Sequence, residues 1–182
     1  MESFLKREHI ALIEENSEKN SLKSSKIELH QMYSNWLNYV SLSKNFDFTK
    51  LKSSDHIGIK IYHDATYFGE IKNGLRNGRG IMKYSNGRVY EGEWINDKRE
   101  GKGYEKFQNE NTYEGYYLNG KPNGSGTYVW STGEIYHGEW INGVKQGKGV
   151  WKGIKGDSFV GEFRNNKANG TGIQRLSKNR KY

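Results

Sequence analysis

Residues 90–103 read YEGEWINDKREGKG, and residues 136–149 read YHGEWINGVKQGKG. The aromatic residue that opens each stretch recurs every 23 residues, and a glycine stands two positions after it. A Gly-x-Gly motif follows in each unit, for example Gly101-Lys-Gly103. Self-similarity at a fixed period of this length predicts a stacked repeat architecture, in which each unit buries its face against its neighbours. The five opening residues, called anchor residues below, are Tyr67, Tyr90, Tyr113, Tyr136 and Phe159.

Within each unit the hydrophobic period is two, which is typical of a β-strand. Tyr90 and Trp94 are predicted to project to one face of the strand, and Glu91 and Glu93 to the other. An asparagine then recurs at one position, usually before glycine, and Asn-Gly is the preferred dipeptide of a two-residue hairpin turn. The repeats therefore predict a mainly β protein, a single-layer, elongated, twisted ribbon of β-hairpins. The glycines leave room for each anchor ring to lie flat on a neighbouring strand.

The region before the repeats is predicted to be different. Residues 1–55 are predicted to form a helical N-terminal extension and linker, with a weak helix over 1–16 and a main helix over about 25–42. Ser25 and Glu28 fit a capping box at the start of the main helix. The boundaries continue with a degenerate half-repeat at 56–66, five repeats at 67–176 and a basic tail at 177–182. One face of the main helix is apolar and is formed by Leu29, Met32, Tyr33, Trp36, Leu37 and Val40.

That apolar face has two explanations. The helix either caps the first hairpins of its own ribbon, as repeat arrays require at their ends, or docks into a partner protein. We expect docking.

Composition excludes several classes of site. The chain has no cysteine, so it offers no disulfide and no thiolate metal or redox site. Its histidines are scattered and show no ligand spacing, and no set of nucleophile, base and acid is apparent. We therefore expect no enzyme activity, no metal and no cofactor. The N-terminal residues lack the apolar core of a secretory signal, which favours a cytoplasmic protein.

The net charge of +8 lies in the repeats, because residues 1–66 carry nine basic and nine acidic residues. A basic column is formed by Lys83, Lys106, Lys152 and Arg175, and a glutamate column by Glu70, Glu93, Glu139 and Glu162. By alternation both columns lie opposite the aromatic side chains. Cross-strand pairing of the two columns is the simpler interpretation. A basic surface for an acidic partner is the alternative.

The repeat units at 90–103 and 136–149 resemble the MORN repeat (membrane occupation and recognition nexus), and the resemblance spans about residues 67–176. It implies an elongated, twisted β-ribbon with an aromatic-lined groove. It also implies a scaffold role in cilia or cytoskeletal assemblies, or phosphoinositide binding. The chain departs from the family pattern at Tyr116 in place of glutamate, at Asp97 and Asn166 in place of a turn glycine, and at Gly153 in place of an aromatic residue.

The aromatic stripe is either the core of the ribbon or a core that also forms a groove for a partner. A single-layer ribbon has no second sheet to cover this face, so we expect some rings to stay exposed and to form a partner site. Nucleic acid is not expected, because alternation places rings and cations on opposite faces. The predicted partner-groove residues are Tyr90, Trp94, Tyr113, Tyr117, Tyr136, Trp140, Phe159 and Phe163.

The sequence thus predicts a non-catalytic scaffold that braces partner proteins in a larger assembly, with a cilium, axoneme or other part of the cytoskeleton as the expected place. One alternative is a peripheral module that binds anionic phospholipids weakly through the basic column. Another is an accessory subunit of an enzyme complex. No small-molecule substrate is expected.

Overall fold

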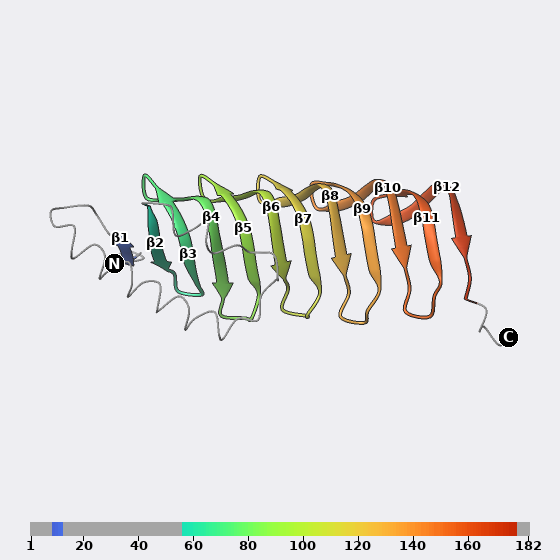
Figure 1. Ribbon diagram of the computed structural model, residues 1–182, viewed down its shortest axis with the longest axis horizontal. Helices are drawn as coiled ribbons and strands as arrows, with labels where there is room; N and C mark the ends of the chain where they lie inside the picture. The colour runs from blue at the N-terminus through green and yellow to red at the C-terminus, as the bar shows by residue number, and fades with distance from the viewer. Residues whose placement is uncertain (1–8, 13–55, 178–182) are drawn as a thin grey trace, which may run out of the picture.

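The computed structural model of the protein describes residues 9–12 and 56–177, and within them all regular structure is β-strand. The strands form one antiparallel sheet in which each strand pairs with its neighbours in chain order. Figure 1 shows them side by side along the long axis of an elongated ribbon. Their bounds are β1 His9–Leu12, β2 Ile57–Ile61, β3 Ala65–Lys72, β4 Leu75–Tyr84, β5 Val89–Ile95, β6 Lys98–Lys106, β7 Thr112–Leu118, β8 Lys121–Val129, β9 Ile135–Ile141, β10 Val144–Lys152, β11 Ser158–Arg164 and β12 Lys167–Arg175.

The predicted ribbon of hairpins is confirmed. Each 23-residue unit forms one hairpin, from β3/β4 to β11/β12, and the predicted half-repeat contributes β2, which pairs with β3. At the start of the chain the structure differs from the sequence-based expectation. His9–Leu12, within the weak helix predicted over 1–16, forms strand β1 and pairs with β2. The main helix predicted over 25–42, with its apolar face, lies outside the described residues, as does the tail from 178 onward.

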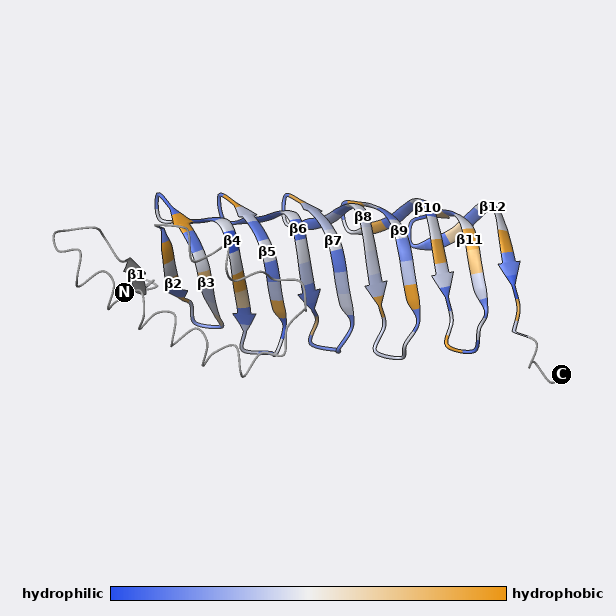
Figure 2. Cartoon of the chain, viewed as in Figure 1, coloured by the Kyte–Doolittle hydropathy of each residue, from blue (hydrophilic) through white to orange (hydrophobic). Residues whose placement is uncertain are grey.

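The hairpin turns follow the predicted asparagine column. In the second hairpin unit both turn residues have positive φ, 48° at Asn96 and 66° at Asp97, and the other four turns repeat this conformation. This is the two-residue turn whose twist matches that of the strands. The turns also contact one another, because the second turn residue donates its backbone N–H to a carbonyl of the preceding unit, as Gly120 does to Arg99 at 2.9 Å. Figure 2 shows the hydrophilic hairpin turns in a row along one edge.

A bulge bends every hairpin at the same point. In the β5/β6 pair the register shifts between Gly92 and Glu93, and the other four units have the same irregularity after the first-strand glycine. The bulge adds residues to the second strand only, so the hairpin end bends relative to the rest of the sheet. The bend gives the two sheet faces different environments. The face that carries the anchor residues is called the aromatic face below, and the other the opposite face.

Candidate functional site: the aromatic face

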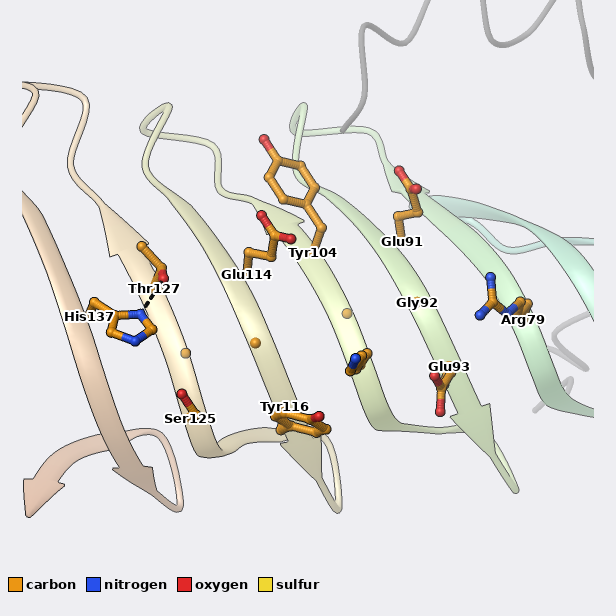
Figure 3. Close-up of a pocket in the computed structure, with 14 residues that line it drawn as sticks. Arg79, Glu91, Gly92, Glu93, Tyr104, Glu114, Tyr116, Ser125, Thr127 and His137 are labelled. Atoms are coloured by element: carbon orange, nitrogen blue, oxygen red, sulfur yellow. Dashed lines mark hydrogen bonds between the residues drawn. The ribbon is translucent and has the colours of Figure 1, made fainter. Parts of the chain in front are cut away.

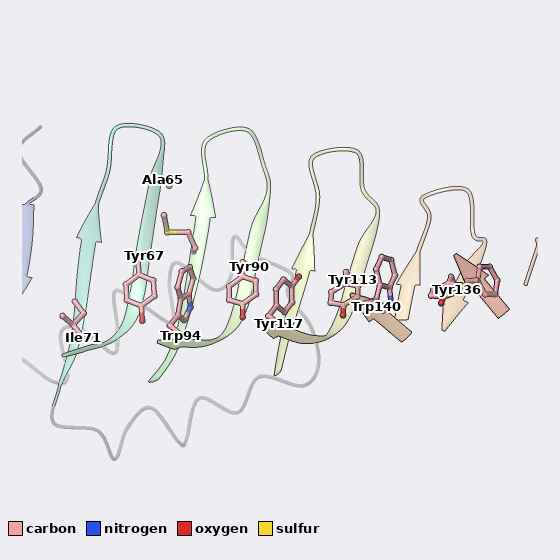
Figure 4. Close-up of a cluster of buried hydrophobic side chains, with 11 residues drawn as sticks. Ala65, Tyr67, Ile71, Tyr90, Trp94, Tyr113, Tyr117, Tyr136 and Trp140 are labelled. Atoms are coloured by element: carbon pink, nitrogen blue, oxygen red, sulfur yellow. The ribbon is translucent and has the colours of Figure 1, made fainter. Parts of the chain in front are cut away.

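The anchor tyrosines are the centre of the aromatic face, and Figure 4 shows them in a row across the strands. Tyr67, Tyr90, Tyr113 and Tyr136 are each 0% exposed. The Tyr90 ring lies over the paired glycines of its hairpin, and a Cβ built on Gly103 would lie 2.5 Å from the Tyr90 hydroxyl oxygen. The hydroxyl donates a 3.0 Å hydrogen bond to the carbonyl of Glu93. The predicted stacking of anchor rings over glycine is therefore confirmed.

The next aromatic column links one unit to the next. Trp94 lies edge-on between Tyr67 and Tyr90, with ring centroids 5.4 Å and 5.1 Å away, and Tyr117 and Trp140 repeat this arrangement further along. Edge-to-face ring pairs of this kind stabilise the fold by more than the burial of their apolar area alone would give. The Trp94 indole N–H also donates to the carbonyl of Gly80 in the preceding unit, at 3.2 Å. The rings thus form one continuous core that runs along the ribbon.

This core changes the interpretation of the predicted partner groove. All of the predicted groove residues lie on the aromatic face, but seven of the eight are buried, and the eighth, Phe159, is partly buried. Among these eight residues the expectation that some rings stay exposed holds only for Phe159, which is partly accessible, because the bent hairpin ends and the neighbouring units cover the other seven. Their role in partner binding stays a prediction. The rings that remain partly accessible are a second row packed against this core, namely Tyr62, Tyr84, Phe107, Tyr128, Trp130, Trp151 and Phe159.

Cations from the bent hairpin ends lie over the rings. The guanidinium of Arg76 lies 4.4 Å from the centroid of Trp94, and that of Arg99 lies 5.3 Å from the centroid of Tyr117. The ammonium of Lys145 lies 4.0 Å from the centroid of Trp130. Burial lowers the pKa of Lys145, and the negative charge of Glu134 opposes this shift only in part.

These cations also overturn a premise of the sequence analysis. The predicted separation of rings and cations onto opposite faces, which is the reason for not expecting nucleic acid, holds for the column of Lys83 but not for Arg76, Arg99 and Lys145. The absence of a nucleic-acid partner therefore stays a prediction.

A buried carboxylate among the rings was missed by the sequence analysis. Glu105 is 1% exposed and accepts hydrogen bonds from Arg99, at 2.8 Å to each oxygen, from Arg88 and from the Tyr117 hydroxyl at 2.8 Å. Two arginines and a hydroxyl compensate the loss of hydration that burial imposes on this charge. The signal was present in the alignment of the units, because Glu105 occupies the position of Met82, Tyr128 and Trp151.

The phenols of the core titrate far from their ordinary range. Burial raises the pKa of Tyr67 and Tyr90, and the nearby arginines, Arg76 and Arg99, oppose this rise only in part. At Tyr136 burial, aided by the charge of Glu139, raises the pKa to about 12. Burial, followed by the charge of Glu105, raises the pKa of Tyr117 as well. The core tyrosines are therefore neutral hydrogen-bond donors at physiological pH.

The opposite face carries the predicted charged columns but does not pair them with each other. Glu93 is opposite Arg79 in the register, and Lys83 is opposite Val89 and Thr66, so the two columns are separated along the strands. The Glu139 carboxylate instead accepts the backbone N–H of Lys148 at 3.2 Å, beside the bulge. Lys106 forms an ion pair with Glu110 at 2.7 Å, and Lys152 and Arg175 are exposed.

A shallow hollow of about 470 Å³ lies on the opposite face at the middle of the ribbon. Figure 3 shows Tyr116 on one side of it and Thr127 and His137 on another. Tyr116 stands where the other units have glutamate, is exposed, and has the Lys102 ammonium 5.7 Å from its ring centroid. The His137 ring nitrogen and the Thr127 hydroxyl are 2.8 Å apart. The hollow therefore combines one exposed ring with charges of both signs.

The described part of the chain has neither a candidate membrane-spanning helix nor a candidate metal-binding cluster. Within residues 9–12 and 56–177, no helix has the length and apolar character needed to cross a bilayer. The same residues hold no cluster of three or more histidine, aspartate or glutamate side chains that could bind a metal ion.

Comparison with known families identifies the class. The MORN repeat model matches residues 67–87, 90–112, 113–135, 136–158 and 159–178, which together make up more than half of the chain. The protein therefore belongs to the MORN repeat family. These matches reproduce the five units and the register of the anchor residues.

No curated protein matches the chain. Among solved structures, one match is the TCP domain of SAS-4 (dCPAP) from Drosophila melanogaster, in a complex with a proline-rich motif of Ana2 (dSTIL). It is 12% identical, covers 66% of this chain and 71% of that chain, and has a TM-score of 0.25. At that score the likeness carries no argument about this protein.

Proposed function

We propose that the protein is a non-catalytic scaffold that binds and braces partner proteins in a larger assembly. One observation carries this proposal: a row of partly accessible aromatic rings lies on a continuously packed core along an elongated ribbon. Rigid aromatic side chains that are only partly covered are enriched at protein interfaces and supply much of their binding energy. Membership in the MORN repeat family supports an interaction module.

The assembly that we propose is cytoskeletal or ciliary, and the protein is proposed to be cytoplasmic. Resemblance to MORN-repeat scaffolds of cilia and the cytoskeleton supports this location. The middle of the row, Phe107 and Trp130, is the proposed contact. Phe107 lies next to a hollow of about 680 Å³ that Arg88 and Tyr128 also line.

The test is affinity capture of the full chain from cells of its native source, followed by mass spectrometry. We expect a defined set of proteins that is lost with the double variant Phe107→Ser/Trp130→Ser. Circular dichroism must first show that this variant is folded, because Trp130 also contacts Lys145. The matched control is Ile154→Ser, which removes an exposed apolar side chain that lies 66% accessible in a loop. Capture of the same proteins by both variants would contradict the proposed contact.

A second candidate is a module that binds anionic membranes through the basic column. The exposure of Lys152 and Arg175 at the C-terminal end of the ribbon favours it. Binding to vesicles that contain anionic lipid should then survive physiological salt and fall with Lys152→Glu/Arg175→Glu. Weak binding that disappears near physiological salt would be the screened attraction expected of any basic protein.

A further inference from the structure

In the three middle hairpins whose first strands are β5, β7 and β9, the end of the first strand carries an exposed apolar residue on the opposite face, and these residues form a row. Ile95, Leu118 and Ile141 are the last residues of β5, β7 and β9, and they are 53%, 45% and 54% exposed. Each follows a buried aromatic residue of the aromatic face, so alternation directs it to the opposite face. We call these three residues and their cross-strand neighbours Lys98, Lys121 and Val144 the turn ridge.

The strand geometry does not require apolar residues at these positions. The equivalent residues of the first and last units are Lys72 and Arg164, and both are exposed. Three successive hairpins therefore each contribute one branched aliphatic side chain that is about half exposed, and together these side chains form a patch of the kind that marks an interaction site. Beside Ile95 there is also a hollow of about 380 Å³, lined by Asn77, Arg79 and Glu93 among others, with room for an incoming side chain.

The ridge is held in a fixed line. Its turns are linked from unit to unit by backbone hydrogen bonds, 3.0 Å from Asp97 to Arg76 and 2.8 Å from Gly143 to Pro122. Because those bonds join neighbouring hairpins directly, the spacing of the three apolar side chains is set by the sheet. A partner therefore meets a preorganised surface, which lowers the entropy cost of binding.

The charge along the ridge is positive. Among the strand-end positions of the described hairpins, Lys72, Lys98, Lys121, Arg164 and Lys167 are basic and exposed, and none is acidic. Glu93 lies on the same strand two residues before Ile95, further from the turn, and one carboxylate in the turn and one on the second strand are occupied within the chain. Asp97 accepts from Arg76 at 2.8 Å and Glu100 accepts the backbone N–H of Asn119 at 2.8 Å. A complementary partner is therefore acidic as well as apolar.

The spacing of the ridge identifies the kind of partner. Neighbouring strands lie about 4.8 Å apart, so equivalent residues two strands apart are separated by about 9.6 Å. Residues seven positions apart on an α-helix are separated by about 10.5 Å along its axis. Over three ridge residues the two spacings therefore differ by only about 2 Å.

We propose that the turn ridge binds an acidic, amphipathic α-helix of a partner protein, with an apolar residue of every heptad seated on Ile95, Leu118 and Ile141 and with carboxylates facing Lys98 and Lys121. The proposal rests on the proposed scaffold function in that the partner is a protein, but it uses a different surface from the row of Phe107 and Trp130. The two surfaces lie on opposite faces of the ribbon, so one protein can bind both kinds of partner at the same time.

The test uses a synthetic helical peptide of about three heptads, with leucine at one position of each heptad and glutamate on both flanks. Fluorescence anisotropy measures its binding to the full-length protein. We expect saturable binding that weakens at least tenfold with Leu118→Asp and several-fold between low and physiological salt. The control variant is Ile173→Asp, which changes an apolar residue of the opposite face that is 65% exposed but lies away from the ridge. It should leave binding unchanged.

A second peptide of the same composition, with its leucines displaced from the heptad, separates register from charge. Equal binding of the two peptides, or binding that Leu118→Asp does not change, overturns the proposal. Binding to anionic vesicles that depends on Leu118, without binding of the heptad peptide, overturns it in favour of a membrane contact. Failure of the peptide while cellular partners still depend on Phe107 and Trp130 removes the ridge site alone. Peptide binding without any such cellular partner leaves the ridge site and removes the aromatic contact.

Discussion

The Tyr117 hydroxyl donates a 2.8 Å hydrogen bond to Oε2 of Glu105, in the middle of a face built from aromatic rings. Both groups lie on the same face as the anchor tyrosines, and Glu105 is a single acidic residue in a column that is otherwise mostly apolar. The carboxylate forms ion pairs with Arg88, which immediately precedes β5, and with Arg99 of β6. These charges lie within the β5/β6 hairpin, and the hydrogen bond from Tyr117 of β7 joins them to the next hairpin. This relationship gives the middle of the ribbon a polar anchor that the outer units lack.

Replacing Glu105 should therefore show whether the charge or only the volume matters. Glu105→Gln leaves two arginines without their counter-charge, and we expect a loss of about 3 kcal/mol in the free energy of unfolding, the lower end for a buried pair because both arginines are partly exposed. Urea denaturation followed by circular dichroism measures it. Glu114→Gln, which neutralises an exposed carboxylate of the opposite face, is the control and should change stability by less than about 0.5 kcal/mol. Equal effects of the two variants would refute the role of the buried cluster.

Trp140 should behave as a core residue. Its ring contacts Tyr113 and Tyr136, and its indole N–H donates to the carbonyl of Gly126 at 3.1 Å. Trp140→Ala is expected to lower the free energy of unfolding by about 3–5 kcal/mol through the lost contacts and the cavity that remains. Thermal denaturation followed by circular dichroism measures this loss. The neighbouring variant Ile141→Ala removes an exposed side chain and should leave the stability nearly unchanged in the same measurement. A Trp140→Ala protein as stable as the parent would show that the ring is not part of the core.

The glycine beneath each anchor ring should be irreplaceable for a steric reason. In Gly103→Ala the new methyl group would lie 2.5 Å from the Tyr90 hydroxyl oxygen and 2.7 Å from a ring carbon, so the ring must move. Gly87→Ala meets nothing within 4 Å but imposes a side chain on a backbone with φ of 86°. We expect Gly87→Ala to lower the free energy of unfolding by about 1–2 kcal/mol through backbone strain alone, and Gly103→Ala to lower it by more. The reverse order in a denaturant titration would contradict the stacking of ring on glycine.

Asp97 should make the protein more stable than the glycine usual at this turn position would, although the φ of Asp97 is positive. Its carboxylate accepts the backbone N–H and the guanidinium of Arg76, at 2.9 Å and 2.8 Å. Burial acts to raise the pKa of Asp97, but the hydrogen bonds from Arg76 outweigh it and hold that pKa below its ordinary value. Asp97→Gly relieves about 1 kcal/mol of strain and loses hydrogen bonds to a charged group worth about 1.5–3 kcal/mol, so the variant should be less stable.

The pH dependence of that variant provides an independent check. Because the folded pKa of Asp97 is lowered, the stability it contributes is present above the unfolded value of 3.8 and is lost as the pH falls through the folded value. Asp97→Gly and the parent should therefore converge in stability in acid and differ near neutral pH. A constant difference across that range would show that the carboxylate charge is not involved.

Alkaline pH should unfold the ribbon through its tyrosines. The folded pKa of Tyr136 is raised from 10.0 to about 12, and those of Tyr67 and Tyr90 are raised further. A raised folded pKa means that stability is complete below pH 10 and falls as the pH rises from there, because only the unfolded chain ionises these phenols readily. Tyrosinate absorbance and the loss of circular dichroism should rise together above pH 10. Ionisation of all tyrosines near pH 10 with the fold intact would refute the burial of these rings.

Much of this protein was determined by its sequence alone. The 23-residue register fixed one hairpin per unit, because alternation and the Asn-Gly turn are local properties that neighbours do not alter. Asp97 and Asn166 kept the turn although they lack glycine's freedom, since asparagine and aspartate also tolerate positive φ. Alternation placed Glu105 and Arg99 on the aromatic face as well, and aligning the units would have revealed them. The strand at His9–Leu12 had no comparable signal, because four residues carry no readable period.

The tertiary structure decided which surface is available to a partner. The burial of Trp94, Tyr117 and Trp140 depends on the bulge that bends each hairpin and on the next unit along the ribbon. Neither effect can be predicted from the position of a residue within its own repeat. The bend also brings Arg76 and Lys145 over rings of neighbouring strands. The exposure of Ile95, Leu118 and Ile141 is also a property of the tertiary structure, since within residues 9–12 and 56–177 no second layer covers the opposite face at the turns. Sequence fixes the face of a side chain through local geometry, whereas its exposure depends on contacts between residues that lie about twenty positions apart.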